Sequence, residues 1–499
     1  MQSLIVGLQF FNLLPSLHAY FPYTGSFLNP APLGGWLAMG MIATTWLLLH
    51  EHSVSKEIRM LWDVLLLIQS CAWLMADSRA AWLAVGIGIS KMLLQKRQVV
   101  VRRQILLLTL SLVLLAIPIY LYKRSSADAR FFIWKICTEM IQDAPLYGHG
   151  PQGVSHNFMH YQKLYLDEKG NDGEKLQATD NRLAFNEGVR LLCEYGICGV
   201  LLMGGLLVVV GRSAPSTKHP CLYLLVGFLL FSCFSYPSEI FSLSSLFMLL
   251  LGSLPQQRFK RKIIVRCRYL IGVLVLLAGT SFIYAFMCIR IDYALNHYYW
   301  DEKEEKLLSD YYTYFSCEHE LVSRYARSLY LAGEYETAIH PLTRMTQLTP
   351  TVEIYCDLGY SHQQLGNFQQ AEECFRYAVA MVPGRMTPHY YLFKLLHSSG
   401  DKERAFQEGK HILQMKVKIE NKEVERMRQE VKSILTHSSY RTTRVVHQTS
   451  PFFVTGRSSP EAMKRLYRSL SKQFFRNKHK NLSPTRHNQS NLSLTLRFL

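Results

Sequence analysis

Two arginines, Arg79 and Arg130, are the strongest candidates for chemistry in this sequence. Arg79 follows Ser78 between two apolar segments, and Arg130 lies near the start of the one long polar loop between apolar segments. A cation at a membrane edge is costly to hold in place and is therefore a candidate for function. A guanidinium group can also donate two parallel hydrogen bonds to a phosphate. The pair predicts a binding site for a phosphate-bearing lipid, with Ser78 in a supporting role.

Long apolar runs must position these arginines. Residues 1–290 are dominated by runs of roughly the 17 to 25 residues that a spanning helix needs. The runs cover residues 4–20, 33–50, 60–76, 80–95, 104–122, 189–211, 220–236, 239–254 and 269–289. We therefore predict an all-α fold, a polytopic helical membrane protein with about nine spans. The first run is the weakest, because Pro15 and His18 interrupt it.

Basic residues in the short loops predict the orientation of these spans. Lys96, Arg97, Arg102 and Arg103 form one basic loop, and residues 258–268 form a second. Loops rich in Lys and Arg stay in the cytoplasm. This rule places the N-terminus inside. It places Arg79, the loop at 123–187 and the chain after residue 290 outside, so the polar signals converge on one face.

The outer loop at 123–187 contains the candidate general bases. Glu187 and His156 can each accept a proton from a hydroxyl group. Gly148 and Gly150 allow a tight turn or the close approach of a ligand to the backbone. Asn186 precedes Glu187 and is a further supporting candidate.

A helix is expected to begin near Glu187 and to continue into a span. Arg190 and Glu194 lie four residues apart in its first turns, a spacing at which the two side chains can form an ion pair. We therefore list Arg190 with the supporting residues of the site. Each of these residues also has a possible role outside binding and catalysis. Arg79 would then be an interfacial anchor, Arg130 a solvated loop residue and Glu187 a first-turn helix residue.

A repeated pattern occupies residues 321–414. Leu358, Gly359, Ala371, Phe375 and Ala378 match the tetratricopeptide pattern in register, with weaker copies before and after it. We predict a soluble α-solenoid over residues 291–436, on the extracytoplasmic side. Such solenoids bind many kinds of partner, so the repeats predict a docking or spacing module for a protein partner.

The charge and the cysteines exclude several classes of protein. The net charge is +18, and after His437 twelve Lys and Arg face the single acid Glu461. This basic tail, 437–499, reads as disordered and fits anionic membrane lipids better than nucleic acid. The eleven cysteines lack paired spacing, and no Asp-x-Asp pair occurs. The sequence thus shows no pattern of metal ligands, and we predict no metal site and no cofactor.

Taken in order, these motifs resemble the O-antigen ligase and polymerase family. The matching segments are Thr24-Gly25-Ser26-Phe27-x-Asn29-Pro30, Asp77-Ser78-Arg79-Ala80-Ala81-Trp82, Arg130-x-x-x-Trp134, Pro145-Leu146-Tyr147-Gly148-x-Gly150, Phe185-Asn186-Glu187 and Glu194-Tyr195-Gly196-x-x-Gly199. The resemblance covers roughly residues 20–255. The Ser-Tyr-Pro turn at 235–237 and the trailing repeats resemble the Bacteroidetes-type members.

The resemblance implies a metal-independent membrane glycosyltransferase of the cell inner membrane. Such enzymes move a glycan from an undecaprenyl-pyrophosphate carrier to an acceptor, which is lipid A core, another carrier-linked repeat or a protein. It also implies that Arg79 and Arg130 hold the pyrophosphate. Two guanidinium groups would stabilise the charge of the leaving group as the sugar–phosphate bond breaks.

The sequence departs from the family at two points. Ligases of the family have a histidine directly before the Asn-Glu pair, where this chain has Phe185. The chain also starts late for the family, which suggests a truncated or divergent member. Two alternatives therefore stay open. One is a protein O-oligosaccharyltransferase whose repeats recruit acceptor proteins, and the other is a non-catalytic, membrane-anchored scaffold. A transporter is a weaker third.

Overall fold

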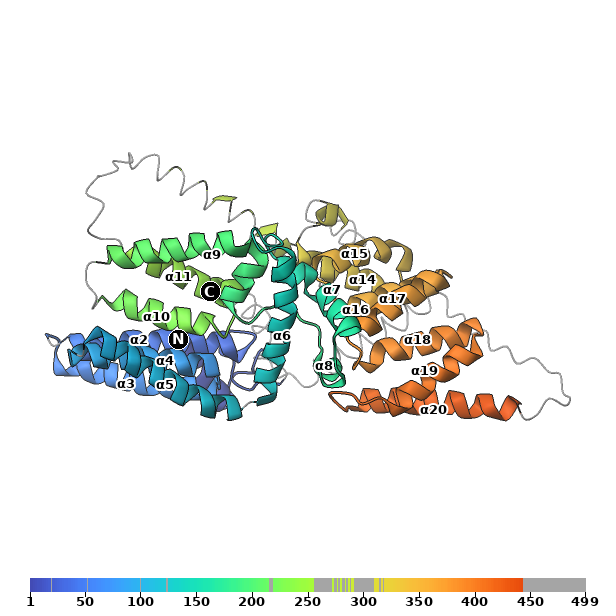
Figure 1. Ribbon diagram of the computed structural model, residues 1–499, viewed down its shortest axis with the longest axis horizontal. Coiled ribbons are helices and arrows are strands. Elements are labelled where there is room, and N and C mark those ends of the chain that lie inside the picture. Colours follow the sequence, from blue (N-terminus) through green and yellow to red (C-terminus); the bar gives the residue numbers. More distant parts are fainter. Residues whose placement is uncertain are drawn as a thin grey trace, which may run out of the picture. The chain divides into compact units, whose positions relative to one another are not determined.

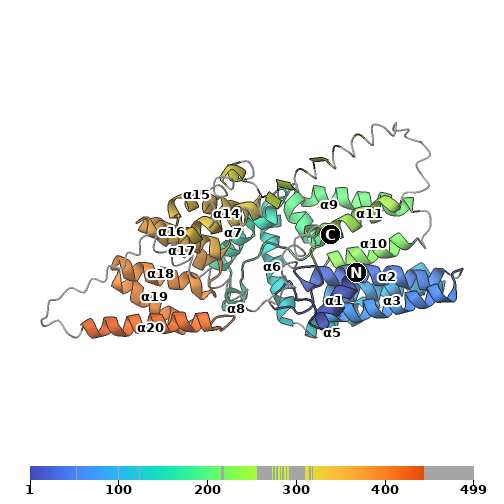
Figure 2. The same ribbon diagram turned by 180° about the vertical axis from the view of Figure 1, so that it is seen from behind.

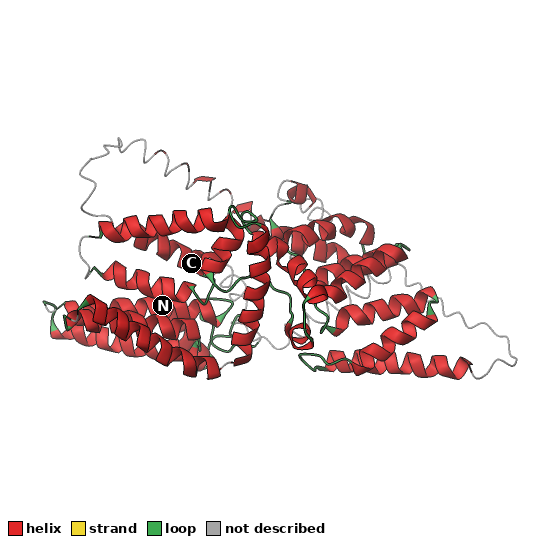
Figure 3. Cartoon of the chain, viewed as in Figure 1, coloured by secondary structure: helices red, strands yellow, loops and turns green. Residues whose placement is uncertain are grey.

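The computed structural model describes residues 1–254 and 318–442, together with scattered residues between 272 and 316. Within the first range, positions 19, 52, 99, 123 and 215–218 are not described. All regular structure in the described residues is helical, as Figure 3 shows, so the predicted all-α class is confirmed. The chain divides into two compact units. The first contains residues 1–154 and 183–254, and the second contains residues 155–182 and 318–442 of the described chain.

The first unit is a helical bundle (Figure 1). Its helices are α1 (Gln2–Phe10), α2 (Pro30–His50), α3 (Lys56–Met75), α4 (Arg79–Lys96), α5 (Val101–Tyr122), α6 (Arg124–Asp143), α9 (Glu187–Ser213), α10 (Pro220–Ser232) and α11 (Phe241–Ser253), with the short 3-10 turn η1 (Pro237–Glu239) between the last two.

Helix α2 lies at the centre of this bundle, in contact with α3, α4 and α10. It begins where the Asn29 side chain accepts a hydrogen bond from the Ala31 amide at 2.9 Å, with Pro30 at the first helical position. A Cβ atom added at Gly34 would lie 2.4 Å from the Cβ of Ser78. Only glycine fits there, and this close approach fixes the start of α4, where Arg79 lies.

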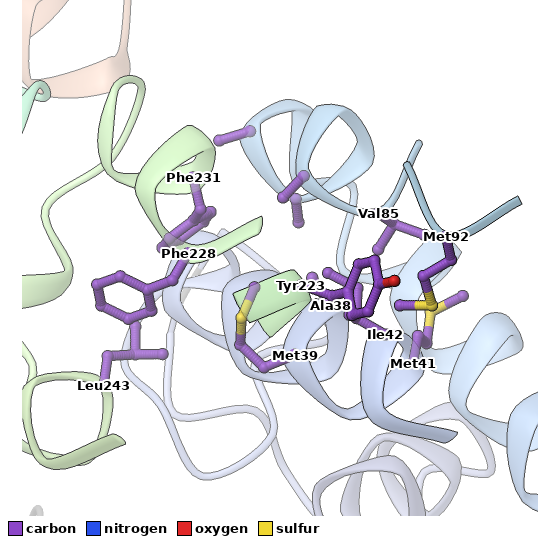
Figure 4. Close-up of a cluster of buried hydrophobic side chains, with 13 residues drawn as sticks. Ala38, Met39, Met41, Ile42, Val85, Met92, Tyr223, Phe228, Phe231 and Leu243 are labelled. Carbon is purple, nitrogen blue, oxygen red and sulfur yellow. The ribbon is translucent and has the colours of Figure 1, made fainter. Parts of the chain in front are cut away.

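The core of the bundle is formed by α2, α4 and α10. Figure 4 shows Tyr223, Phe228 and Phe231 of α10 with side chains of α2 and α4, among them Ile42 and Val85. Small residues of α4 let the three helices approach closely. The largest buried rings come from α10, so this short helix closes the core beside the two longer ones.

Three helices of the described chain are long and apolar enough to cross a membrane: α2, α3 and α9. Helix α3 has little protein around it, since only Ala72 is buried among its residues. Large apolar side chains such as Leu61, Leu65 and Ile68 are exposed along it. Exposed apolar surface of this extent is expected against lipid rather than water.

The predicted count of about nine spans is not confirmed. The first predicted span, 4–20, is wrong as a single helix, because α1 ends at Phe10 and Asn12 has a positive φ of 57°. Helices α10 and α11 have 13 residues each, or about 20 Å, which is less than the roughly 30 Å of a hydrocarbon core. Of the last predicted span, 269–289, the structure describes only scattered residues.

The second unit contains stacked helical hairpins, which Figure 2 shows from behind. Its helices are α7 (Gly153–Glu168), α8 (Asp172–Gln177), α14 (His319–Ala332), α15 (Tyr335–Leu348), α16 (Val352–Gln364), α17 (Phe368–Met381), α18 (Met386–Ser399), α19 (Lys402–Gln414) and α20 (Lys422–Thr442). Helices α14 to α19 form three consecutive hairpins, as the repeat pattern predicted for residues 321–414.

The residues that match the repeat pattern pack between the paired helices, as predicted. Ala371, Phe375 and Ala378 are fully buried on α17. A Cβ atom at Gly359 would lie 2.7 Å from the Phe375 ring, so glycine permits α16 and α17 to pack closely. The Phe375 ring also stacks on Tyr391 of the next hairpin, with centroids 5.7 Å apart. One side chain thus joins two repeats.

Removal of the Phe375 ring should loosen the packing between the two repeats. Phe375→Ala is expected to destabilise the repeats by about 3–5 kcal/mol, because it removes a fully buried ring and leaves a cavity. Hydrogen exchange of peptides from α16 to α18, measured by mass spectrometry on the full chain, should become much faster. Phe368→Ala is the matched control on the same helix, since Phe368 is half exposed; equal exchange in both variants would contradict the prediction.

The predicted domain boundaries differ from the observed division at two points. The predicted membrane domain, 1–290, included the whole outer loop at 123–187, whereas residues 155–182 pack with the repeats. The Gln162 side chain, which is almost fully buried, donates a hydrogen bond to the Met381 carbonyl at 2.8 Å. Lys418 donates to the carbonyl of Gln177 at 3.1 Å. At the other end of the repeats, α20 continues to Thr442, past the predicted boundary at 436; the tail beyond it lies outside the described residues.

Candidate functional site

Arg79 and Arg130 come from separate helices of the first unit. Arg79 is the first residue of α4, where Ser78 is buried at the N-cap position. Arg130 lies in the second turn of α6, and α6 follows α5 almost directly. The Arg79 guanidinium donates a hydrogen bond to the Ser126 hydroxyl of α6 at 2.9 Å. This contact links the start of α4 to the helix that presents Arg130.

The two arginines influence each other electrostatically. The pKa of Arg130 is lowered to about 10, first because its guanidinium is buried and then because of the positive charge of Arg79. Tyr236 acts in the opposite direction. Two cations held this close together in a partly buried place repel each other. An anionic ligand between them would relieve that repulsion.

An aromatic ring lies against the Arg130 guanidinium, and a second ring packs against the first. Its guanidinium lies over the Phe185 ring, 5.6 Å from the centroid, a geometry that stabilises a cation. Phe185 meets the Tyr236 ring edge to face at 5.4 Å. Phe185 also has a positive φ of 51°, which is strained for a bulky residue. Trp134 of α6 donates a hydrogen bond to the carbonyl of Ala184 at 2.9 Å and so holds the segment that bears Phe185.

Glu187 belongs to a network of charges at the start of α9. One of its oxygens accepts from Arg190 at 2.9 Å, and the other accepts from the amide of Ser238 at 3.1 Å and from the Ser238 hydroxyl. Arg190 also pairs with Glu194 at 2.8 Å, as its spacing predicted, and with Glu239 at 3.8 Å. Three carboxylates therefore gather around one guanidinium, at the turn η1 between α10 and α11.

Asn186 has a structural role in the observed geometry. Its side-chain oxygen accepts hydrogen bonds from the amides of Gly188 and Val189 at 2.9 and 3.2 Å. It is thus the N-cap of α9 and satisfies two of the donors that a helix start leaves unpaired. By fixing the first turn of α9, Asn186 also fixes the direction of Glu187 and Arg190.

Two glycine-containing motifs, 145–150 and 194–199, pair through their backbones. The amides of His149 and Gly150 donate to the carbonyls of Cys193 and Glu194 at 2.8 and 2.9 Å, and the Ile197 amide donates to the Pro145 carbonyl at 2.9 Å. Helix α9 is interrupted at Gly196, with φ 61° and ψ −162°. These bonds replace those that the helix loses at the interruption.

Only glycine fits at the two points where these segments meet. A Cβ atom at Gly148 would lie 2.4 Å from the carbonyl carbon of Glu194, and one at Gly196 would lie 2.3 Å from that of Leu146. Both glycines also have positive φ. The predicted close approach at Gly148 is therefore an approach of the chain to itself. Gly150 has a φ of 83° with open space around its Cα, which fits the predicted tight turn.

His156 lies on α7, within the second unit. Burial and the positive charge of Arg344 lower the pKa of this imidazole. A neutral imidazole is the form that can accept a proton. The structure therefore gathers Ser78, Arg79, Arg130, Glu187 and Arg190 in one unit and puts His156 in the other.

Sequence reasoning missed several residues of this site. Tyr236, Ser238 and Glu239 belong to the polar turn between α10 and α11, which was recognised only as a tight turn. A polar run between two short apolar segments was the available signal. Phe185 was noted as a departure from the family, but its contact with Arg130 was not foreseen. Among the described residues, no three side chains cluster as metal ligands do.

Together, fold and site define a helical membrane protein that carries an α-solenoid, with one arginine at the start of α4 and a second in the second turn of α6. The family model described as O-antigen ligase matches residues 64–204, and a tetratricopeptide repeat model matches residues 352–385. The chain thus carries an O-antigen ligase domain followed by tetratricopeptide repeats, and the resemblance seen in the motifs is confirmed for residues 64–204. No curated protein matched the chain.

The matched O-antigen ligase region includes both arginines, the motif at 145–150 and the start of α9. It also includes residues 155–182, which pack with the repeats. The match supports a membrane glycan transferase of the ligase or polymerase type.

Proposed function

We propose that this protein transfers a glycan from an undecaprenyl-pyrophosphate carrier to an acceptor during assembly of a surface polysaccharide. The observation that carries the proposal is the proximity of Arg79 and Arg130: the Arg79 guanidinium donates a hydrogen bond to Ser126, one helical turn before Arg130 on α6, and its charge lowers the pKa of Arg130. Like charges held together by a fold cost free energy, and a bound diphosphate removes that cost. The protein acts in the cell inner membrane, with the arginines and the repeats on the extracytoplasmic side.

In the proposed reaction the acceptor hydroxyl oxygen attacks the anomeric carbon of the glycan. The new carbon–oxygen bond forms as the bond from that carbon to the phosphate oxygen breaks, and the anomeric configuration inverts. The electron pair of the broken bond stays on the diphosphate, where Arg79 and Arg130 stabilise it without a metal ion. The proton of the hydroxyl passes to a general base.

Two residues remain candidates for the general base. Glu187 lies in the same unit as the arginines, and its carboxylate is held in place by Arg190 and Ser238. Burial and the charge of Arg344 lower the pKa of His156, which favours the neutral imidazole that can accept a proton. Replacement of each in turn, by Gln and by Ala respectively, separates them. A general base acts only when it is deprotonated, so loss of the acidic limb of the pH–rate profile marks the base.

One observation favours a second candidate function. Phe185 stands where ligases of the family have a histidine, and its ring contacts Arg130 instead of offering a proton acceptor. A non-catalytic scaffold would tolerate this replacement. A protein O-oligosaccharyltransferase, with repeats that recruit the acceptor protein, is the alternative within the enzyme class.

Replacement of Arg79 tests the proposal. Arg79→Gln is expected to abolish the surface glycan, because one of the two cations that bind the diphosphate is lost; Arg79→Lys keeps the charge but loses the forked geometry and should retain part of the activity. Surface glycan is measured by gel electrophoresis and staining, at matched protein levels in the membrane.

The control lies at the opposite end of the same helix. Arg97, the C-cap residue of α4, is exposed, and Arg97→Gln should leave the glycan unchanged. Unchanged glycan in both Arg79→Gln and Arg79→Glu would remove the basis of the enzyme proposal and favour the scaffold.

A further inference from the structure

The outer-loop segment 155–182 and the repeats enclose a cavity within the second unit. Its volume is about 520 Å³, a size usual for small-ligand sites. The loop contributes Ser155, Asp180, Asn181 and Arg182, and the facing wall comes from α14, α15 and α16. Because both walls belong to one compact unit, the cavity is a feature of that unit alone.

Asp180 fastens the loop to the repeats at the edge of the cavity. One of its oxygens accepts a hydrogen bond from the Val352 amide at 2.8 Å, and the other pairs with Arg385. The Arg182 guanidinium donates a hydrogen bond to the ring of His319, the first residue of α14, at 3.1 Å. These contacts tie the loop to α14 and α16, so this wall of the cavity is held by specific bonds.

The charged side chains that line the cavity are already paired with protein groups. Arg327 donates to Glu353 at 2.7 Å and to Asp357 at 2.9 Å. Glu320 accepts from Arg324 at 2.8 Å. Together with their partners Arg324 and Arg385, the four carboxylates and the two arginines of the lining make four acids and four guanidinium groups, so the cavity offers no net charge to attract an anion. A cationic ligand would have to compete with arginines that neutralise the carboxylates in place.

The remaining hydrogen-bonding capacity suits hydroxyl groups. A paired carboxylate still has lone pairs to accept from a hydroxyl. The Ser323 hydroxyl can donate and accept, and the Thr351 hydroxyl, which accepts from the Ile354 amide, can still donate. Apolar atoms of Ala326, Leu342 and Ile354 complete the lining. Mixed donors and acceptors beside an apolar patch match a sugar, which has hydroxyls at its edge and C–H groups on its faces.

We propose that this cavity between the outer loop and the repeats binds an uncharged stretch of glycan, about two or three sugars long by its volume. The inference rests on the proposed function, because a glycan is the substrate class which that function assigns. The repeats would then contact the glycan directly, through the wall that they share with the loop, in addition to any protein that they bind elsewhere.

Binding to the full-length protein in detergent tests the proposal. The probe is a set of neutral oligosaccharides, released by mild acid from the surface polysaccharide of the cells that make this protein. We expect saturation-transfer NMR to detect binding to the wild type. Ser323→Trp, which fills the cavity, should weaken binding by about tenfold or more, and Asn181→Ala by severalfold.

Glu336→Gln is the matched control, since Glu336 is exposed on α15 and does not line the cavity. Hydrogen exchange of α14 to α16 verifies that the variants stay folded; should Ser323→Trp fail this check, Asn181→Ala decides. The proposal is overturned if the wild type binds no oligosaccharide, if Asn181→Ala and a folded Ser323→Trp both bind like the wild type, or if trilysine peptide binds in preference to the glycan.

This measurement fails or succeeds independently of the proposed function. Oligosaccharide binding is measured by NMR without any transfer reaction, whereas the proposed function is tested by the amount of surface glycan in cells with the Arg79 variants. If Arg79→Gln abolishes the surface glycan but the wild type binds no oligosaccharide, only the cavity proposal is wrong. If the wild type binds oligosaccharide but the Arg79 variants make normal surface glycan, the transferase proposal is wrong and the protein is a glycan-binding membrane protein.

Discussion

Arg130→Ala is expected to reduce the rate of glycan transfer by about 100- to 1,000-fold, with little change in the amount of protein in the membrane. The Arg130 guanidinium is partly buried and lies over the Phe185 ring, and the charge of Arg79 lowers its pKa. Such a group stabilises a diphosphate most when charge develops on it, in the transition state. The loss should therefore appear mainly in kcat rather than in KM. The assay is transfer from a lipid-linked donor in proteoliposomes.

A second arginine on the same helix provides the control. Arg124 is largely exposed and pairs with Asp128 at 3.7 Å. Arg124→Ala should leave the rate within about twofold, because surface ion pairs contribute little. If Arg130→Ala and Arg124→Ala behave alike, Arg130 has no special role. The double variant Arg79→Gln, Arg130→Ala should be little worse than either single one, since groups that bind one diphosphate act as a unit.

Gly196→Ala is expected to prevent the first unit from folding properly. The added methyl group would lie 2.3 Å from the Leu146 carbonyl carbon, and the backbone at φ 61° and ψ −162° is essentially restricted to glycine. Strain and overpacking together cost at least about 2 kcal/mol. The variant should show a lower melting temperature and a broadened peak in size-exclusion chromatography in detergent, with loss of surface glycan.

A glycine further along α9 separates this effect from a general intolerance of the helix. Gly204 has no atom within 4 Å of an added Cβ, so Gly204→Ala should behave as the wild type. Gly148→Ala should resemble Gly196→Ala, because its Cβ would meet the Glu194 carbonyl carbon from the other side. A normal melting temperature for Gly196→Ala would contradict the observed pairing of the two motifs.

Local features of this chain were predictable because their causes are local. Buried repeat positions such as Phe375 and Ala378 follow from a fixed period, and the ion pair between Arg190 and Glu194 follows from helical spacing. Most apolar runs became helices close to their predicted ends. The run at 4–20 did not, because length and hydropathy alone do not show where a backbone leaves the helix.

Contacts between distant polar segments could not be predicted in this way. Nothing in the spacing of Gln162 or Asp180 indicates that they bond with Met381 and Val352, some 200 residues later. Asn186 and Gly148 were recognised as unusual, but one sequence cannot show whether an unusual residue binds a ligand or supports the fold. The structure gives both of them support roles, as a helix cap and as a point of close backbone contact.

A stop codon placed before α14 would remove more than a recruitment module. Segment 155–182 buries Gln162 against the Met381 carbonyl and ties the carbonyl of Gln177 to Lys418. Without α14 to α20, this insert between α6 and α9 would lose its packing partner and expose unpaired polar groups. Truncated alleles would then resemble active-site mutants even if the repeats recruit no partner. Point substitutions on the outer surface of the solenoid therefore give a better test of partner recruitment.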